Sequence, residues 1–198
     1  KFGAAGMRGV NTINYPFDVE RMNIDVDGTA KLIKLVKPAV AAFGQSVFLF
    51  PTPLKELHDA FQEAECRVWY DGAHVMGLIA GGKFQDPLHE GADVLTGSTH
   101  KTLPGPQHGI MLSDSGDEKF IRKLQRAVFP GVLSNHHLHA MAALGVTLAE
   151  FLEYGRAYAD QIVRNAKALA QALHENGIKV LAEKAGFTES HAIALDVA

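Results

Sequence analysis

The sequence contains a single cysteine and no long apolar run, and these two absences exclude several classes of protein. Cys66 has no second cysteine with which to form an internal disulfide, which is typical of chains that work in a reducing compartment. No stretch is apolar over the roughly 20 residues that a membrane-spanning helix needs. No G-x-G-x-x-G motif follows a predicted strand, so a dinucleotide-binding loop is not indicated. We therefore expect a cytoplasmic protein.

Neither sign of charge is in excess. The chain has 19 Lys and Arg against 22 Asp and Glu, with a net charge of −3, so neither nucleic acid nor a membrane surface is expected as a partner. A length of 198 residues suits one domain and part of a second. The chain begins without methionine and stops within an apolar run, so we expect a fragment of a longer protein.

Short apolar runs alternate with amphipathic stretches along the chain. The runs predict strands at 39–43, 68–70, 94–98 and 109–112. Helical spacing predicts helices ending near Lys37, starting at Pro53, covering about 117–127, and running to Glu175 with an interruption at Gly155. Ser134 or Asn135 is expected to cap the helix before Gly155, and Gly177 to follow the last one. This alternation predicts an α/β fold with a mainly parallel sheet sandwiched by helices.

The stretch 93–109 places a lysine directly after a predicted strand. The strand begins at Val94, and Lys101 follows its end in a loop that Pro104 and Pro106 keep irregular. A lysine held there would be partly desolvated, and desolvation lowers the pKa of an ammonium group. A neutral amine can attack a carbonyl and form a Schiff base. The alternative is a lysine that points into water from a strand end.

The stretch 67–74 places an acid after another predicted strand. This strand ends in Asp71, and His74 follows three residues later. Ligands of open α/β sheets collect at the carboxyl ends of strands, so we expect Asp71 and Lys101 to face one crevice. A buried acid and a Schiff-base lysine are the pair that pyridoxal phosphate uses. The carboxylate keeps the pyridine nitrogen protonated, and the lysine binds the aldehyde.

Three segments together resemble the serine hydroxymethyltransferases and their relatives among the fold-type-I pyridoxal phosphate enzymes. They are D-G-A-H-V-M-G-L-I-A-G-G at 71–82, S-T-H-K-T-L-P-G-P at 98–106 and V-F-P-G at 128–131. The resemblance implies an aspartate aminotransferase-like large domain at residues 1–176, with its N-terminal part missing. Residues 177–198 would begin a small α/β domain, with strands at 178–181 and 192–197. The phosphate-binding Ser/Gly loop, the histidine that stacks on the cofactor and the arginine that binds the substrate carboxylate would lie outside the chain.

The resemblance also implies catalytic roles for four residues. Lys101 would hold the cofactor as a Schiff base, and Asp71 would hold its pyridinium nitrogen. His74 would lie near the 3-oxygen of the cofactor ring or near the substrate hydroxyl. His100 would either relay protons or make a structural hydrogen bond.

Further cofactor contacts are expected from two other places. Ser46 is either a cofactor-side hydroxyl or a turn residue, and Ser98 belongs to the lysine motif. In the family, the loop after Phe-Pro-Gly donates backbone N–H groups to the cofactor phosphate of the neighbouring subunit. This implies that role for Gly131, Ser134 and Asn135, and a homodimer or dimer of dimers with shared active sites.

Three histidines crowd the start of the following predicted helix. Of His136, His137 and His139, only the first and last have the spacing that places two ligands on one helix face. No acid or cysteine lies close to them in sequence. We predict that no metal is bound.

Two positions depart from the family pattern. The chain has V-L-S-N at 132–135, where hydroxymethyltransferases usually have G-Q-G-G, and Gln107, where they usually have arginine. Both departures are more similar to a divergent branch that includes threonine transaldolases and aldolase-type enzymes.

The resemblance implies an enzyme that makes or breaks the Cα–Cβ bond of a β-hydroxy amino acid. Serine, threonine or glycine would be the substrate, and an aldehyde or a folate the co-substrate. Two alternatives stay open: a hydroxymethyltransferase that depends on tetrahydrofolate, and a transaldolase or aldolase that does not. Another pyridoxal phosphate reaction, such as racemisation, and a fragment that is inactive alone are further alternatives.

Overall fold

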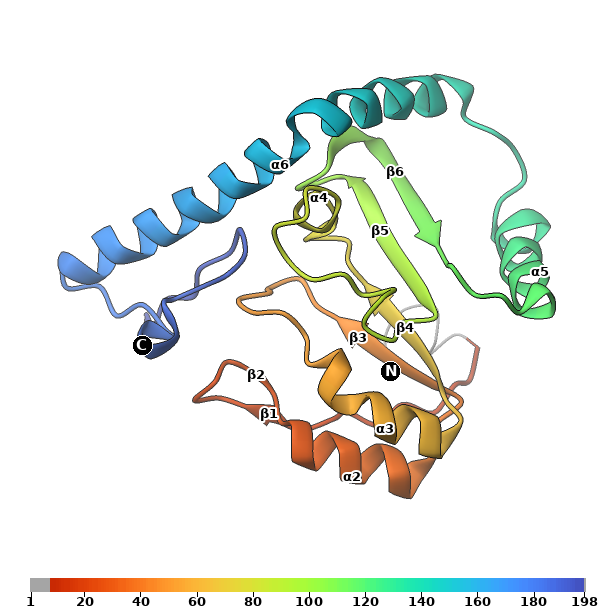
Figure 1. Cartoon of the computed structure of the whole chain (residues 1–198), viewed down its shortest axis with the longest axis horizontal. Helices are drawn as coiled ribbons and strands as arrows, with labels where there is room; N and C mark the ends of the chain where they lie inside the picture. Colours follow the sequence, from red (N-terminus) through yellow and green to blue (C-terminus); the bar gives the residue numbers. More distant parts are fainter. Residues whose placement is uncertain (1–7, 198) are drawn as a thin grey trace.

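The structure is a computed structural model that describes residues 8–197, so the ends of both predicted domains, residues 1–7 and Ala198, lie outside the described residues. Its centre is a four-stranded sheet in the order β3–β4–β5–β6 (Figure 1). The strands are β3 (Val40–Gly44), β4 (Arg67–Asp71), β5 (Val94–His100) and β6 (Pro104–Leu112). The first three run parallel, and β6 runs antiparallel to β5. The predicted α/β class with a mostly parallel sheet flanked by helices is confirmed.

The helices lie near the bounds that the apolar spacing predicts, except that the short helix at Met76–Ala80 was not predicted. They are α2 (Val26–Val36), α3 (Leu54–Ala64), α4 (Met76–Ala80), α5 (Glu118–Arg126) and α6 (Leu138–Glu175), with a π-helical turn at Ala127–Val132 and a 3-10 helix at Glu183–Ala185. A short antiparallel pair, β1 (Phe17–Asp18) and β2 (Asn23–Ile24), precedes α2. No helix of residues 8–197 is both long and apolar enough to cross a membrane.

The strands β3 and β4 bury alternate side chains, so one face of the sheet holds the main hydrophobic core. Phe43 of β3 and Tyr70 of β4 point into this core, and the ring of Phe61 on α3 lies 5.5 Å from that of Phe43. On the other face of the same strands, Val40 and Trp69 are exposed. Within residues 8–197, helices therefore cover only one face of the sheet at β3 and β4.

The predicted interruption at Gly155 is wrong, because α6 continues through it to Glu175. A Cβ placed on Gly81, at the end of α4, would lie 2.5 Å from the Cβ of Ala159 and 2.5 Å from the carbonyl oxygen of Gly155. The absence of a side chain at Gly81 thus lets α4 approach α6 at this crossing. Gly155 lies at a helix contact and is not a helix break.

The start of α6 and the C-terminal strands also differ from prediction. His137, not Ser134 or Asn135, is the N-cap of α6. The runs 178–181 and 192–197 do not form strands: they meet at one antiparallel bridge between Val180 and Leu195. Pairing ends there because the chain turns into the 3-10 helix after Ala182. Gly177 does follow α6 with the predicted positive φ, +83°.

The C-terminal segment and the end of α6 share a second, smaller core. Its buried residues are Ala170, Val180 and Phe187. This separate core accords with a small domain after residue 176, but the boundary at 176/177 stays a prediction.

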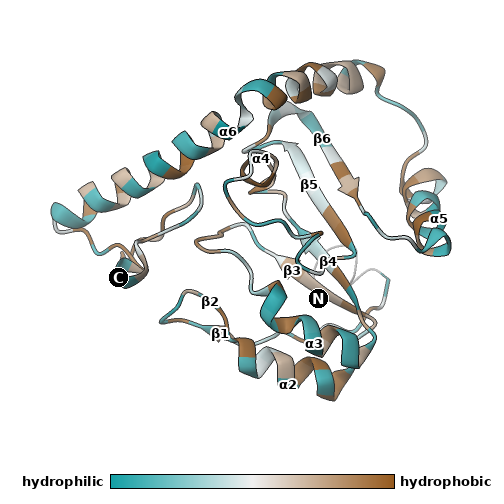
Figure 2. Ribbon diagram, in the orientation of Figure 1, coloured by the Kyte–Doolittle hydropathy of each residue, from teal (hydrophilic) through white to brown (hydrophobic). Residues whose placement is uncertain are grey.

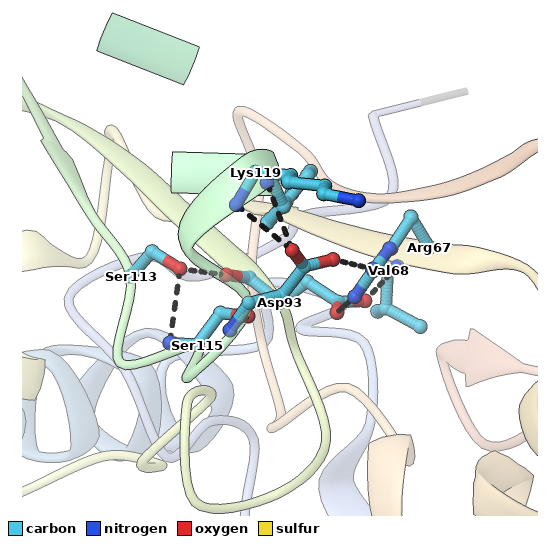
Figure 3. A network of polar contacts seen from close by, with 8 residues as sticks. Arg67, Val68, Asp93, Ser113, Ser115 and Lys119 are labelled. Carbon is cyan, nitrogen blue, oxygen red and sulfur yellow. Dashed lines mark hydrogen bonds and ion pairs between the residues drawn. The ribbon is translucent and has the colours of Figure 1, made fainter. Parts of the chain in front are cut away.

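A polar network at the amino ends of β4 and β5 ties α5 to the sheet (Figure 3). Asp93 accepts hydrogen bonds from Nη1 of Arg67 at 2.6 Å and from the backbone N–H of Val68 at 2.7 Å. Nη2 of Arg67 reaches Asp117, the N-cap of α5, at 3.1 Å. The Arg67 guanidinium also lies 4.4 Å from the ring centroid of Phe120. This network lies at the end of the sheet opposite the carboxyl ends of the strands.

Replacing Asp93 by alanine is expected to lower the free energy of unfolding by about 2 kcal/mol, because Val68 loses its acceptor and Arg67 loses one of its two carboxylate partners. The matched control is Asp59→Ala on the exposed side of α3, which should change stability by less than about 0.5 kcal/mol. Urea unfolding followed by circular dichroism measures both variants. Equal midpoints for the two variants would contradict a stabilising role for this network.

Candidate functional site

The carboxyl ends of β3, β4 and β5 meet at one edge of the sheet because these strands are parallel. Figure 2 shows that β5 is hydrophobic at its start and becomes polar toward this edge. The buried residues Val94 and Leu95 give way to Ser98 and His100. The loops that follow the three strand ends therefore supply the polar side chains of the candidate site.

Asp71, the last residue of β4, is half-buried at this edge. Its Oδ1 accepts a hydrogen bond from the backbone N–H of Ala73 at 3.0 Å, which orients the carboxylate. Gly44, the last residue of β3, pairs with Asp71 in parallel register. Its φ of +122° lies in the region that favours glycine, and a Cβ there would lie 2.8 Å from the Cβ of Asp71. A larger residue at Gly44 would therefore displace the acid.

The loop that carries His74 is joined to the loop that carries Lys101. The hydroxyl of Thr102 donates to the carbonyl oxygen of His74 at 2.8 Å and accepts from the backbone N–H of Gly77 at 3.1 Å. A Cβ on Gly77 would overlap the carbonyl group of Thr102 and would lie 2.6 Å from the backbone nitrogen of Leu103. Close packing of α4 on the residues after β5 thus holds the two site loops together.

Gly77→Ala is expected to destabilise the protein by about 2–3 kcal/mol, because the new methyl group meets backbone atoms that cannot rotate away. The matched control is Gly145→Ala in α6, where a Cβ would meet nothing within 4 Å. That variant should be neutral or up to about 1 kcal/mol more stable, as alanine favours helix. Thermal and urea unfolding separate the two cases, and equal stability of both variants would rule out this close contact.

Lys101 lies directly after β5, as predicted, but its side chain is exposed and not partly desolvated. Its Nζ donates a hydrogen bond to the hydroxyl of Ser98 at 3.0 Å. Among residues 8–197, no carboxylate forms an ion pair with this amine. The amine therefore lies beside a neutral partner, which leaves it available to a carbonyl compound.

The pKa of His74 depends on both Asp71 and Lys101. Burial lowers the pKa of His74 below its ordinary value of 6.5, the charge of Lys101 lowers it further, and the charge of Asp71 raises it. Asp71 at the end of β4 and Lys101 after the end of β5 therefore both influence the imidazole of His74. The net shift of the His74 pKa is downward, which favours the neutral imidazole at pH 7.

The remaining predicted residues lie in two places. Ser46 is exposed in the loop after β3, at the same edge of the sheet as Asp71, and His100 is exposed at the end of β5. Gly131, Ser134 and Asn135 are exposed between α5 and α6, and none of their contacts within residues 8–197 reaches Asp71, His74 or Lys101. Figure 1 shows this connection on the far side of β6 from α4.

The histidines near α6 do not form a recognisable metal site. Nε2 of His108 lies 3.1 Å from Nδ1 of His137, and the ring of His139 lies 6.0 Å from that of His137. No group of three or more His, Cys, Asp or Glu suited to a metal occurs within the described part of the chain.

Sequence reasoning missed His191. This residue lies in the C-terminal segment, and its ring centroid is 6.2 Å from that of His74. The sequence carries no local signal for this contact, since it depends on how the segment after α6 folds back.

The three motif segments lie at or near the sheet edge and in the α5–α6 connection. Comparison of the chain with protein-family models identifies the family that carries these motifs. The matching model, described as serine hydroxymethyltransferase, matches residues 4–198. The chain belongs to the serine hydroxymethyltransferase family. The predicted resemblance is thereby confirmed.

Named relatives in this family are close in sequence. The serine hydroxymethyltransferases of Picrophilus torridus and Thermoplasma acidophilum are 66% and 64% identical to the chain over 197 residues, which is 100% of it. These matches cover 45% and 46% of the two relatives, so the chain spans about half the length of the curated relatives it matches. The departures at Gln107 and 132–135 thus occur in a chain that remains similar to proteins of that name.

A solved structure shares the fold. L-threonine transaldolase from Pseudomonas fluorescens in internal aldimine state matches with a TM-score of 0.91 and 35% sequence identity. The match covers 98% of this chain and 44% of that one. This likeness supports the predicted relation between the family and transaldolases.

Proposed function

We propose that the chain is part of a pyridoxal phosphate-dependent serine hydroxymethyltransferase, which makes or breaks the Cα–Cβ bond of serine or glycine with a folate co-substrate. The observation that supports this proposal is the placement of Asp71 and Lys101 at the carboxyl ends of neighbouring parallel strands, in a chain 66% identical to a serine hydroxymethyltransferase. The free, buried thiol of Cys66 supports a cytoplasmic location.

The residues at this edge fit pyridoxal phosphate. The Lys101 amine lies beside the neutral Ser98 hydroxyl and is available to the aldehyde. The Asp71 carboxylate is oriented by Ala73 and suits a protonated ring nitrogen. When bound, the cofactor supplies an electron sink for charge that develops at the substrate Cα.

The residues of the chain have separate tasks in this proposal. Lys101 binds the cofactor aldehyde, and Ser98 holds the amine by accepting its hydrogen bond. Asp71 keeps a proton on the ring nitrogen. His74 is neutral at pH 7 and can accept a proton from a substrate hydroxyl or donate a hydrogen bond to it. His100 and Ser46 are proposed as further polar groups at the same edge.

Absorbance and product analysis test this function in the intact protein. Adding pyridoxal phosphate should produce a visible band, and borohydride should leave a reduced adduct on the peptide that contains Lys101. Serine should then yield glycine in a reaction that requires tetrahydrofolate. A missing band or an adduct on another lysine would contradict the cofactor site.

A threonine transaldolase or aldolase is the second candidate, since a transaldolase shares the fold at a TM-score of 0.91. Gln107 also stands where hydroxymethyltransferases usually have arginine, so a cation near the site is lost. Turnover of threonine with an acceptor aldehyde, at equal rates with and without tetrahydrofolate, would favour this candidate.

We also propose a homodimer with shared active sites. The connection that contains Gly131, Ser134 and Asn135 does not reach the Asp71 site of its own chain. The same region exposes apolar side chains, which are costly to leave in water. They are Phe129, Val132, Leu138, Met141 and Leu152. A second subunit would cover this surface and receive the connection at its own site.

Mixing two inactive variants tests the shared site. Lys101→Ala removes the amine, and Ser134→Asp places a negative charge where a phosphate is expected. Each variant alone should be inactive, but refolding them together should restore about a quarter of wild-type activity, since half of the dimers then contain one intact site. No recovery in mixed dimers, confirmed as dimers by size-exclusion chromatography, would place each site within one subunit.

A further inference from the structure

The segment after α6 brings a second imidazole to the candidate site. The rings of His74 and His191 lie 6.2 Å apart between centroids, with an angle of 24° between their planes. Asp71, at the end of β4, and Lys101, after β5, act electrostatically on the same His74. His191 is therefore a neighbour of this group that comes from a distant part of the sequence.

Buried hydrogen bonds fix the position of His191. The hydroxyl of Thr188 donates to the carbonyl oxygen of Leu49 at 3.2 Å, and the hydroxyl of Ser190 donates to that of Phe48. Both hydroxyl residues are fully buried. Phe48 and Leu49 follow β3, so the segment is attached to the same edge of the sheet that carries Asp71. His191 comes directly after this anchor.

The environment of His191 disfavours a charge on its ring. Nδ1 of His191 is buried and has no hydrogen-bond partner among residues 8–197. Burial lowers the pKa of His191, and a charge on His74 would lower it further. A cationic ring there would leave a buried N–H group without an acceptor, which is costly. Burial and the missing partner thus both favour a neutral ring beside His74.

We propose that His191 is a positioning residue, which packs against His74, shields that imidazole from water and holds it beside Asp71 and Lys101. The proposal rests on the proposed function, because it assigns His191 to the site of the same reaction. Its consequence is that His74 stays neutral and oriented at pH 7, ready to exchange a proton with the substrate.

Deuterium exchange at Cε1 of each imidazole, followed by mass spectrometry across pH, tests this in the intact protein without need of turnover. In the wild type, His74 should titrate below 6.5. His191→Ala admits water and should raise the His74 midpoint by about half a pH unit or more. His191→Phe retains a ring and should leave the midpoint within about 0.2 unit of wild type. His58→Ala, on the exposed side of α3, is the control and should change nothing.

An unchanged His74 midpoint in His191→Ala, or equal shifts in the alanine and phenylalanine variants, would overturn the proposal. If the alanine variant does not fold, His191→Gln takes its place, since glutamine lacks the ring and lets water approach. The expected upward shift is then the same, and its absence is equally decisive.

Turnover gives a second and separate readout. If serine is converted to glycine, the acid limb of kcat/KM against pH should move upward in His191→Ala and stay in place in His191→Phe. A purely structural role would lower activity without moving this limb. If the intact protein has no such activity, the proposed function fails, while the His74 titration still decides the role of His191.

Discussion

Lys101→Ala in the intact protein is expected to lower kcat by about a thousandfold or more, because no other group can take the place of the amine that binds the cofactor aldehyde. The visible band and the borohydride-stable adduct should disappear together. Stability should change little, since the side chain is exposed and donates one hydrogen bond, to Ser98.

The matched control is Lys123→Ala, which removes an exposed lysine from α5. Its spectrum and turnover should equal those of the wild type. If Lys101→Ala kept both the band and the turnover, the assignment of the Schiff-base lysine would be wrong, and so would the cofactor site built around it.

Asp71→Asn is expected to lower kcat by about a hundredfold to a thousandfold, the second largest effect, while the fold and the lysine adduct are retained. Asparagine has nearly the same shape and can still accept the hydrogen bond from Ala73. It lacks the negative charge that keeps the ring nitrogen of the cofactor protonated. The loss therefore isolates the charge of Asp71 from its structural role.

Steady-state kinetics with serine and tetrahydrofolate, combined with adduct mapping on Lys101, measure this effect. Asp59→Asn on α3 is the control for a lost surface carboxylate. A wild-type rate in Asp71→Asn would show that the acid is not needed to hold a proton on the ring. A lost adduct would instead show that Asp71 is needed for cofactor binding itself.

Sequence reasoning worked best where local chemistry sets structure. Apolar runs located β3, β4 and the start of β5, whose parallel carboxyl ends meet at the edge where the site was predicted. Asp71 and Lys101 were paired on this ground, and their shared role stays a prediction. The prediction that Pro104 and Pro106 keep the chain irregular is wrong, because β6 begins at Pro104. The same local rules failed at Gly155, where α6 continues and a Cβ would lie 2.5 Å from the ring of Phe151.

Tertiary structure decided the features that depend on contacts between distant segments. Three of these features have no local signal in the sequence, since each arises from how the C-terminal segment and the strand-end loops pack. They are the exposure of Lys101, the anchoring of Thr188 and Ser190 to the loop after β3, and the approach of His191 to His74. The sequence by itself determined the α/β class through its periodicity and the family through the resemblance of its motifs, and it predicts the acid and the lysine of the candidate site. Only the fold determined which further imidazole reaches them, because side chains far apart in the chain meet only after the backbone has packed.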